Sequence, residues 1–256
     1  DVLRQQHDHR ERRADLRLRG VELGRGRHRH GARMNPLARA IIRCAAAPAA
    51  FTYDDIPDQL LRINSLEGSL AFSGSTLTGV TDVSPVGGTV TVTGSPVYTA
   101  SDAGLNGAPS FSVLSQTDVV APNINRANIN FVACVYYRGG AFQYAWDSTT
   151  GANVSKGGSN GTTSFLVNST NLTVPSSPLR FRMLIPIDGT TATTVNGSSV
   201  GTVAANAASS TGILFGIRRD GAAATRSRIA FFMVCSSVPD APTRAALEAK
   251  LLADFG

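Results

Sequence analysis

The chain has 256 residues with 24 Lys or Arg and 18 Asp or Glu, a formal net charge of +6. Residues 1–43 hold 12 of the basic residues and five acids, a net of +7, so residues 44–256 hold 12 basic residues against 13 acids, a net of −1. This near-neutral body argues against a nucleic-acid-binding surface built into the fold, and its length suits a single domain.

Residues 1–43, the basic arm, are rich in Arg, His, Gly and Leu and cannot bury a core of their own. Three interpretations stay open. The arm lacks structure in isolation, or is an out-of-frame translation of GC-rich DNA with Met34 as the natural start. It orders against a partner through arginines that pair with acidic groups or phosphates, namely Arg10, Arg12, Arg13, Arg25, Arg27 and Arg29. It binds a metal through His7, His9, His28 and His30.

The metal interpretation has the least support, because His-x-His pairs without Cys or a rigid scaffold are not specific. We therefore expect no metal site and no cofactor. Residues 34–47 predict a short helix, since Arg39 and Arg43 interrupt a signal-peptide-like run, and we expect no membrane span. The three cysteines are too scattered for a disulfide framework, and Cys134 and Cys235 are expected as buried thiols.

Residues 44–59 are expected to form a polar connector, after which apolar residues alternate with a period of two, as strands require. The apolar runs cover residues 90–92, 129–135, 142–146, 179–187, 213–215 and 229–234. In the run 179–187, Arg180 and Arg182 fall on the opposite, wetter side from Phe181 and Met183. Hairpin dipeptides such as Asn196-Gly197 lie between the runs. The pattern predicts an antiparallel β-sandwich.

A helix is predicted over residues 240–256, closing a domain that we place at residues 60–256. Asp240 is the expected N-cap and Pro242 suits the first turn. One apolar stripe runs along the helix, and Arg244 and Glu248 are expected to pair at i, i+4. The stripe consists of Leu247, Leu251 and Phe255.

Several segments, in this order, resemble a concanavalin A-like (laminin-G-type) jelly roll of the kind found in phage and phage-like virion proteins and in exported bacterial proteins. The matching segments are 95–98, 106–111, 195–201, 213–216, 228–234 and 242–256, and the resemblance covers about residues 60–256. Arg228 and Phe231 stand where that family often has Gly and Glu, and Asp82-Val83 where it has Trp-Asp-Ser-Gly. The resemblance implies an all-β jelly roll with a C-terminal helix.

The body lacks the residues that hydrolases on such folds need. From Cys44 onward there is no histidine and only two glutamates, Glu67 and Glu248. A glycosidase requires a close pair of carboxylates, and a Ser or Cys nucleophile requires a histidine within hydrogen-bonding reach. We therefore expect a protein that is not an enzyme.

Two groups of residues are candidate binding surfaces. Tyr144, Trp146 and Asp147 could form a sugar-stacking platform with a carboxylate, although we favour the interpretation that Trp146 continues the core face of Phe142 and Tyr144. Tyr136 and Tyr137, at a strand end, could form a contact patch.

These observations lead to an expected function. We expect a structural or attachment protein of a phage or phage-like particle, such as a tail-fibre or capsid-decorating component, with lectin-like glycan binding as a further role and the basic arm as its tether. The expected partners are other virion proteins, further copies of the chain and a cell-surface glycan, and the expected location is the virion. The alternative is a secreted or cell-surface carbohydrate-binding module.

Overall fold

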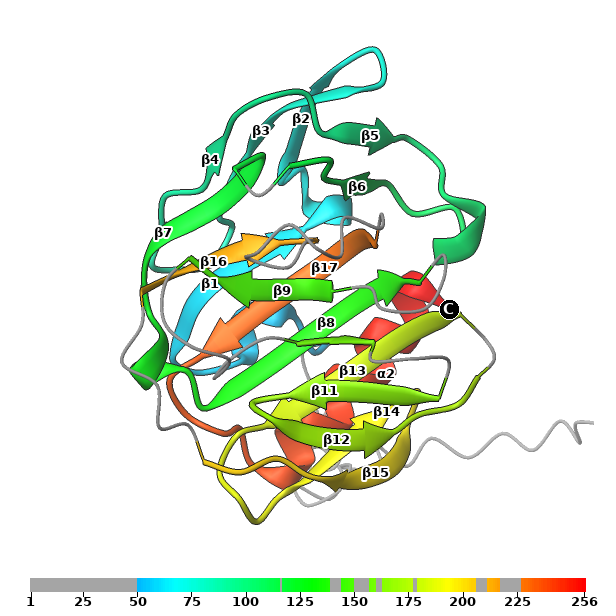
Figure 1. Ribbon diagram of the computed structural model, residues 1–256. Coiled ribbons are helices and arrows are strands. Elements are labelled where there is room, and N and C mark those ends of the chain that lie inside the picture. Colours follow the sequence, from blue (N-terminus) through cyan, green and yellow to red (C-terminus); the bar gives the residue numbers. More distant parts are fainter. Residues whose placement is uncertain are drawn as a thin grey trace, which may run out of the picture. The chain divides into compact units, whose positions relative to one another are not determined.

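Two antiparallel β-sheets and one α-helix make up the part of the chain that the computed structural model describes (Figure 1). That part comprises residues 50–115, 117–138, 144–149, 157–159, 163–176, 179–205, 211–216 and 227–256. It belongs to one compact unit, Ala50–Gly256, which begins earlier than the domain start expected at residue 60. The basic arm, its arginines and histidines, and the helix expected over residues 34–47 lie outside the described residues.

The larger sheet has ten strands. They are β1 (Gln59–Asn64), β2 (Leu70–Ser73), β3 (Thr76–Val80), β5 (Val97–Thr99), β6 (Ser110–Ser112), β8 (Phe131–Tyr137), β13 (Arg180–Pro186), β14 (Ala192–Val195), β15 (Ser198–Thr202) and β17 (Arg228–Cys235). Their order is β15-β14-β13-β8-β17-β6-β5-β3-β2, and β1 also pairs with β17. The run predicted at residues 179–187 is therefore β13, an interior strand of this sheet.

The smaller sheet has seven strands. They are β4 (Thr91–Val92), β7 (Val119–Asn125), β9 (Tyr144–Ser148), β10 (Gly157–Ser159), β11 (Ser164–Val167), β12 (Thr170–Thr173) and β16 (Thr211–Phe215). Their order is β12-β11-β10-β9-β16-β7-β4. Three short 3-10 turns connect described strands, and a fourth, η2 (Tyr53–Asp55), precedes β1; the three are η3 (Ser65–Glu67), η4 (Ala103–Leu105) and η5 (Arg126–Asn128). Every strand pairing described is antiparallel.

The main core lies between the two sheets. Phe232 of β17 meets Phe215 of β16 edge to face, with ring centroids 5.0 Å apart, and Trp146 of β9 at 5.4 Å. Cys134 of β8 and Phe181 of β13 belong to the same buried cluster. Such edge-to-face aromatic contacts across facing sheets are typical of a close-packed sandwich. The predicted all-β sandwich is confirmed.

The second core lies on the other face of the larger sheet, under the helix α2 (Ala241–Phe255). Asp240 is the N-cap and accepts a hydrogen bond from Thr243 N at 2.9 Å. The predicted apolar stripe is fully buried against β8, β13 and β17, so this prediction is confirmed; it comprises Leu247, Leu251 and Phe255. No helix in the described residues is long and apolar enough to cross a membrane.

Because α2 covers this face, two sequence expectations were wrong. Arg182, placed on a wet face, is 9% exposed, and its Nη1 donates to the carbonyl of Gly256 at 2.7 Å. The Arg244–Glu248 pair does not form: Arg244 Nη1 donates to the carbonyl of Pro239, while Glu248 faces Arg182. The run 129–135 is likewise buried on both faces, since β8 lies between the main core and α2.

The predicted buried thiols are confirmed. Cys134 and Cys235 are free and fully buried, and burial raises the pKa of both, that of Cys235 to about 12. Cys134 contributes to the main core and Cys235 to the core under α2. Both therefore behave as small apolar core residues.

The packing of α2 gives a test with adjacent residues. Leu251 is completely buried and Leu252 is 51% exposed. Leu251→Ala should lower the free energy of unfolding by about 2–5 kcal/mol, because the truncation leaves a cavity under the helix. Leu252→Ala should change it by less than about 0.5 kcal/mol. Denaturant unfolding of both variants measures the difference, and equal effects would mean that α2 does not pack as described.

Candidate functional site

Trp146, the centre of the sugar-stacking platform proposed from sequence, is not available to a ligand. Trp146 is 3% exposed and lies in the main core, between Phe165 and Phe232. A buried indole offers no face to a sugar ring, so the stacking interpretation of Trp146 is wrong. Tyr144 begins β9, but its side chain lies outside the described residues.

Asp147, next to Trp146 on β9, is buried for a structural reason. It lies close enough to the buried Arg126 to oppose the desolvation that lowers the pKa of that guanidinium to about 10. Its Oδ1 also accepts a hydrogen bond from Ser148 N at 2.7 Å. Consecutive strand residues point to opposite faces, so Trp146 and Asp147 cannot act on one ligand.

The two tyrosines proposed as a contact patch at the end of β8 also lie in different environments. Tyr136 is completely buried and contacts Phe181 with ring centroids 5.4 Å apart, and burial raises its pKa well above the usual value. Tyr137 is half-buried beneath the guanidinium of Arg228, 4.2 Å from its ring centroid, and Arg228 in turn pairs with Asp102 at 2.7 Å. The two tyrosines therefore do not share a surface.

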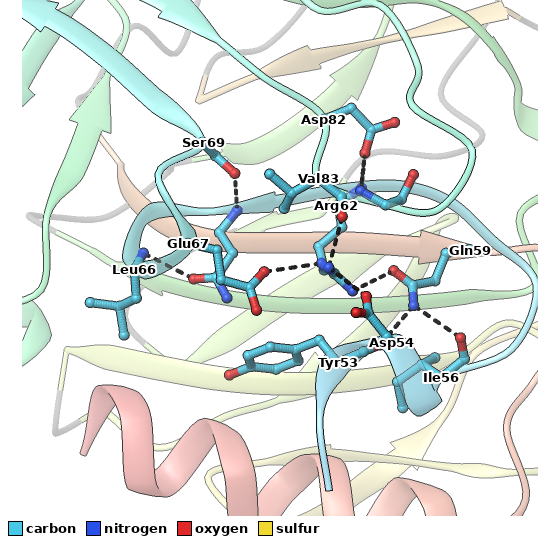
Figure 2. A network of polar contacts seen from close by, with 12 residues as sticks. Tyr53, Asp54, Ile56, Gln59, Arg62, Leu66, Glu67, Ser69, Asp82 and Val83 are labelled. Atoms are coloured by element: carbon cyan, nitrogen blue, oxygen red, sulfur yellow. Dashed lines mark hydrogen bonds and ion pairs between the residues drawn. The ribbon is translucent and has the colours of Figure 1, made fainter.

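A polar network around Arg62 of β1 is a second candidate, shown in Figure 2. The Nη2 of Arg62 donates to Asp54 at 2.8 Å and to the carbonyl of Val83 at 2.7 Å, and its Nη1 donates to Gln59 Oε1 at 3.1 Å. Glu67 lies 3.3 Å from Nε. Partners within the domain surround this guanidinium, so the network holds residues 53–59 on β1 rather than a ligand.

The best candidate is a groove beside α2, with a volume of about 360 Å³. Strand alternation points one side chain of β13 and two of β14 toward the helix, whose first two turns form the opposite wall. We call it the helix groove. It is lined by Leu184, Ala192, Thr194, Gly197, Ala241, Arg244, Ala245 and Glu248.

The turn between β14 and β15 closes one end of the helix groove. Asn196 and Gly197 have φ values of 51° and 81°, the left-handed conformation that the predicted Asn-Gly hairpin requires. The side chain of Asn196 accepts from Arg182 N at 2.9 Å and donates to the Arg180 carbonyl at 3.1 Å, which fixes the turn to β13. A Cβ at Gly197 would lie 3.9 Å from Glu248 Oε1, so the turn stands beside that carboxylate.

Glu248 is the charged group of the helix groove. Its side chain is 19% exposed, and burial raises its pKa, an effect that Arg182 opposes. Arg182 Nε lies 3.6 Å from Oε1, too far for a hydrogen bond. Neither carboxylate oxygen nor the buried hydroxyl of Thr194 makes a hydrogen bond of normal geometry, although Arg182 and Thr194 lie close enough to the carboxylate to oppose the rise of its pKa. The groove thus presents acceptors to a ligand that carries donors.

Sequence reasoning missed this site because its lining comes from three elements. Glu248 was assigned to a surface pair within α2, and nothing in the sequence shows that β14 lies beside the helix. The one local signal was the Asn196-Gly197 hairpin, which identifies the turn but not its neighbour.

No protein-family model matches the sequence, and no curated protein matches it. Solved structures do resemble the fold. A botulinum neurotoxin type C chain, for which interaction with two ganglioside molecules is described, aligns with a TM-score of 0.53 and 14% identity over 76% of this chain and 51% of that chain. The binding domain of serotype D/C VPI 5993 gives 0.51 and 14%, over 76% and 52%. A neurotoxin DC binding domain in complex with rat synaptotagmin II gives 0.50 and 13%, over 78% and 52%.

This chain therefore spans about half the length of those neurotoxin chains. At this level of identity the similarity shows a shared fold. It supports the β-sandwich architecture that the resemblance to concanavalin A-like domains implied.

The Arg62 network predicts that substitutions of Arg62 and of Asp54 lower the free energy of unfolding by different amounts. Arg62→Ala leaves the buried oxygen of Gln59 and the part-buried carbonyl of Val83 without their donor, and should destabilise the fold by about 1–3 kcal/mol. Asp54 is 70% exposed, so Asp54→Ala should cost less than about 1 kcal/mol. Urea unfolding measures both variants. Comparable losses would show that the ion pair, rather than the buried hydrogen bonds, holds the segment.

Proposed function

We propose that this domain is a non-enzymatic carbohydrate-binding β-sandwich. The observation that carries the proposal is the helix groove, whose volume of about 360 Å³ falls within the range of small-molecule sites and which contains a carboxylate and a hydroxyl that make no hydrogen bond of normal geometry within the domain. Sugars bring many hydroxyl donors. The fold similarity to neurotoxin binding domains, one of them described with gangliosides, supports the same class of ligand.

The arrangement of carboxylates supports binding rather than hydrolysis. Glycosidases use two carboxylates on either side of the scissile bond. The lining of the helix groove contains one, Glu248, and the other glutamate of the body, Glu67, pairs with Arg62. The described residues contain no cluster of three or more His, Cys, Asp or Glu suited to a metal.

We propose that the chain is a structural or attachment component of a phage or phage-like particle, and that the basic arm tethers it there. The support is the resemblance in the sequence of residues 60–256 and the net charge of +7 on residues 1–43. Virion proteins and further copies of the chain would then be its partners. The alternative carrier is a secreted or cell-surface module, which the similarity to neurotoxin binding domains supports as well.

The binding proposal is tested with a broad glycan panel. The full chain should bind a restricted set of neutral or complex glycans, saturably and without hydrolysing them, because the groove offers acceptors but no acid and nucleophile pair. Reducing-end analysis after long incubation detects cleavage. Absence of binding across the panel, or release of sugar, would refute the proposal.

The carrier is tested on the native source. If the chain is a particle component, it should copurify with particles in fixed stoichiometry, and added salt should weaken its attachment because exposed charge pairs are screened over about 10 Å at 0.1 M. Protein beginning at Met34 should fail to incorporate. If residues 34–256 incorporate as well as the full chain does, the basic arm is not the tether. Recovery of the chain free of particles would favour the secreted module.

A further inference from the structure

The helix groove contains acceptors that the domain satisfies only in part. Both oxygens of Glu248 and the hydroxyl of Thr194 are buried without a hydrogen bond of normal geometry, and the nearest groups to the carboxylate are Arg182 Nε, at 3.6 Å, and Thr194 itself. Buried acceptors without donors are energetically unfavourable, and hydrogen bonds to a carboxylate are stronger than those between neutral groups. A ligand that supplies two or three donors to this corner of the groove gains more than it could on an ordinary surface.

The charges around Glu248 favour neutral donors over cationic ones. Arg182 of β13 stands behind the carboxylate at 3.6 Å, and Arg244 lines the groove one turn earlier on α2. Two guanidinium groups thus accompany one carboxylate, which disfavours an ammonium ligand. β14 and the Asn196-Gly197 turn add no ionisable group to the lining.

An acidic sugar fits less well than a neutral one. Its carboxylate would have to lie beside Glu248. One nitrogen of each guanidinium is also engaged with the main chain, because Arg182 Nη1 donates to the Gly256 carbonyl at 2.7 Å and Arg244 Nη1 to the Pro239 carbonyl at 2.5 Å, while Arg182 Nε faces Glu248 itself. Hydroxyl groups remain as the donors that suit both the charge and the geometry.

The lining of the groove favours a ring that enters by its edge. Ala192, Gly197, Ala241 and Ala245 have little or no side chain, and the lining has no aromatic residue on which a ring could stack. Leu184 adds an apolar surface for the C–H groups of a sugar. The groove would then distinguish one sugar from another by the positions of their hydroxyl groups rather than by ring stacking.

We propose that the helix groove binds a neutral pyranose edge-on, with two neighbouring hydroxyls donating to the carboxylate oxygens of Glu248 and a third polar group bonded to Thr194 Oγ1. Arg182 acts as a positioning residue that keeps the carboxylate charged. This inference rests on the proposed carbohydrate binding and adds its site and the class of sugar.

The test uses amide NMR spectra of the full chain, titrated with methyl α-D-glucopyranoside, methyl α-D-mannopyranoside and methyl α-D-galactopyranoside, and with the best glycan of the panel. Glucosamine and N-acetylneuraminic acid serve as the cationic and acidic counterparts. A neutral sugar should shift amides of α2 and β14 saturably. Affinity should fall as the pH is lowered through the raised pKa of Glu248, because the protonated carboxyl accepts fewer hydrogen bonds.

Three variants locate the site. Glu248→Gln should weaken binding of the neutral sugar by about tenfold or more and remove its pH dependence, and Thr194→Val should weaken it severalfold. Ala245→Leu fills the groove while both acceptor residues stay in place, and should abolish binding. Ala249→Leu, on an exposed position of the same helix outside the groove, is the matched control and should bind as the parent does. Thermal melts confirm that each variant is folded.

The outcomes separate this inference from the function on which it rests. If the chain binds a glycan and Ala245→Leu leaves the affinity unchanged, carbohydrate binding stands and the groove assignment is wrong. If glucosamine or N-acetylneuraminic acid binds in the groove more tightly than the neutral sugars, the ligand class is wrong. If no sugar or panel glycan produces saturable shifts anywhere, both proposals fail.

Discussion

The burial of one face of the larger sheet by α2 is the contact on which the rest of this structure depends. It lets β8, β13 and β17 carry apolar residues on both faces, one side for the core between the sheets and the other for the helix. The same contact draws Arg182 out of water and gives it a backbone partner at Gly256. It also brings Glu248 beside β13, which creates the helix groove.

The fold was predictable where local patterns correspond to local structure. The alternation at residues 179–187 predicted β13, and the Asp240 cap with the stripe of Leu247, Leu251 and Phe255 predicted α2. Each signal depends on neighbours within a few residues, because side-chain period and capping are properties of one element. The strand order and the position of the helix depend on contacts between distant segments. For this reason the alternation alone assigned Arg182 to a solvent-exposed face.

The candidate site could not be predicted for a related reason. Trp146 and Asp147 drew attention as residue types found at sugar sites, yet the position of β9 turns the indole into the core and places the carboxylate near the buried guanidinium of Arg126. The groove residues are plain types, Ala, Thr, Gly and one Glu, that acquire meaning only from their neighbours. Composition indicated which chemistry was absent, since the body has no histidine, but did not indicate where binding would occur.

The two walls of the helix groove belong to different sides of the core under α2. Leu184 and Thr194 come from the sheet, whereas Ala245 and Glu248 come from the helix. A molecule that bridges these walls binds only while the helix is docked, so by mass action its presence shifts the equilibrium between docked and detached helix toward the docked form. Occupancy of the groove and the integrity of the domain are therefore thermodynamically linked, and a medium rich in the ligand would protect this end of the chain from local opening and from proteases that act on it.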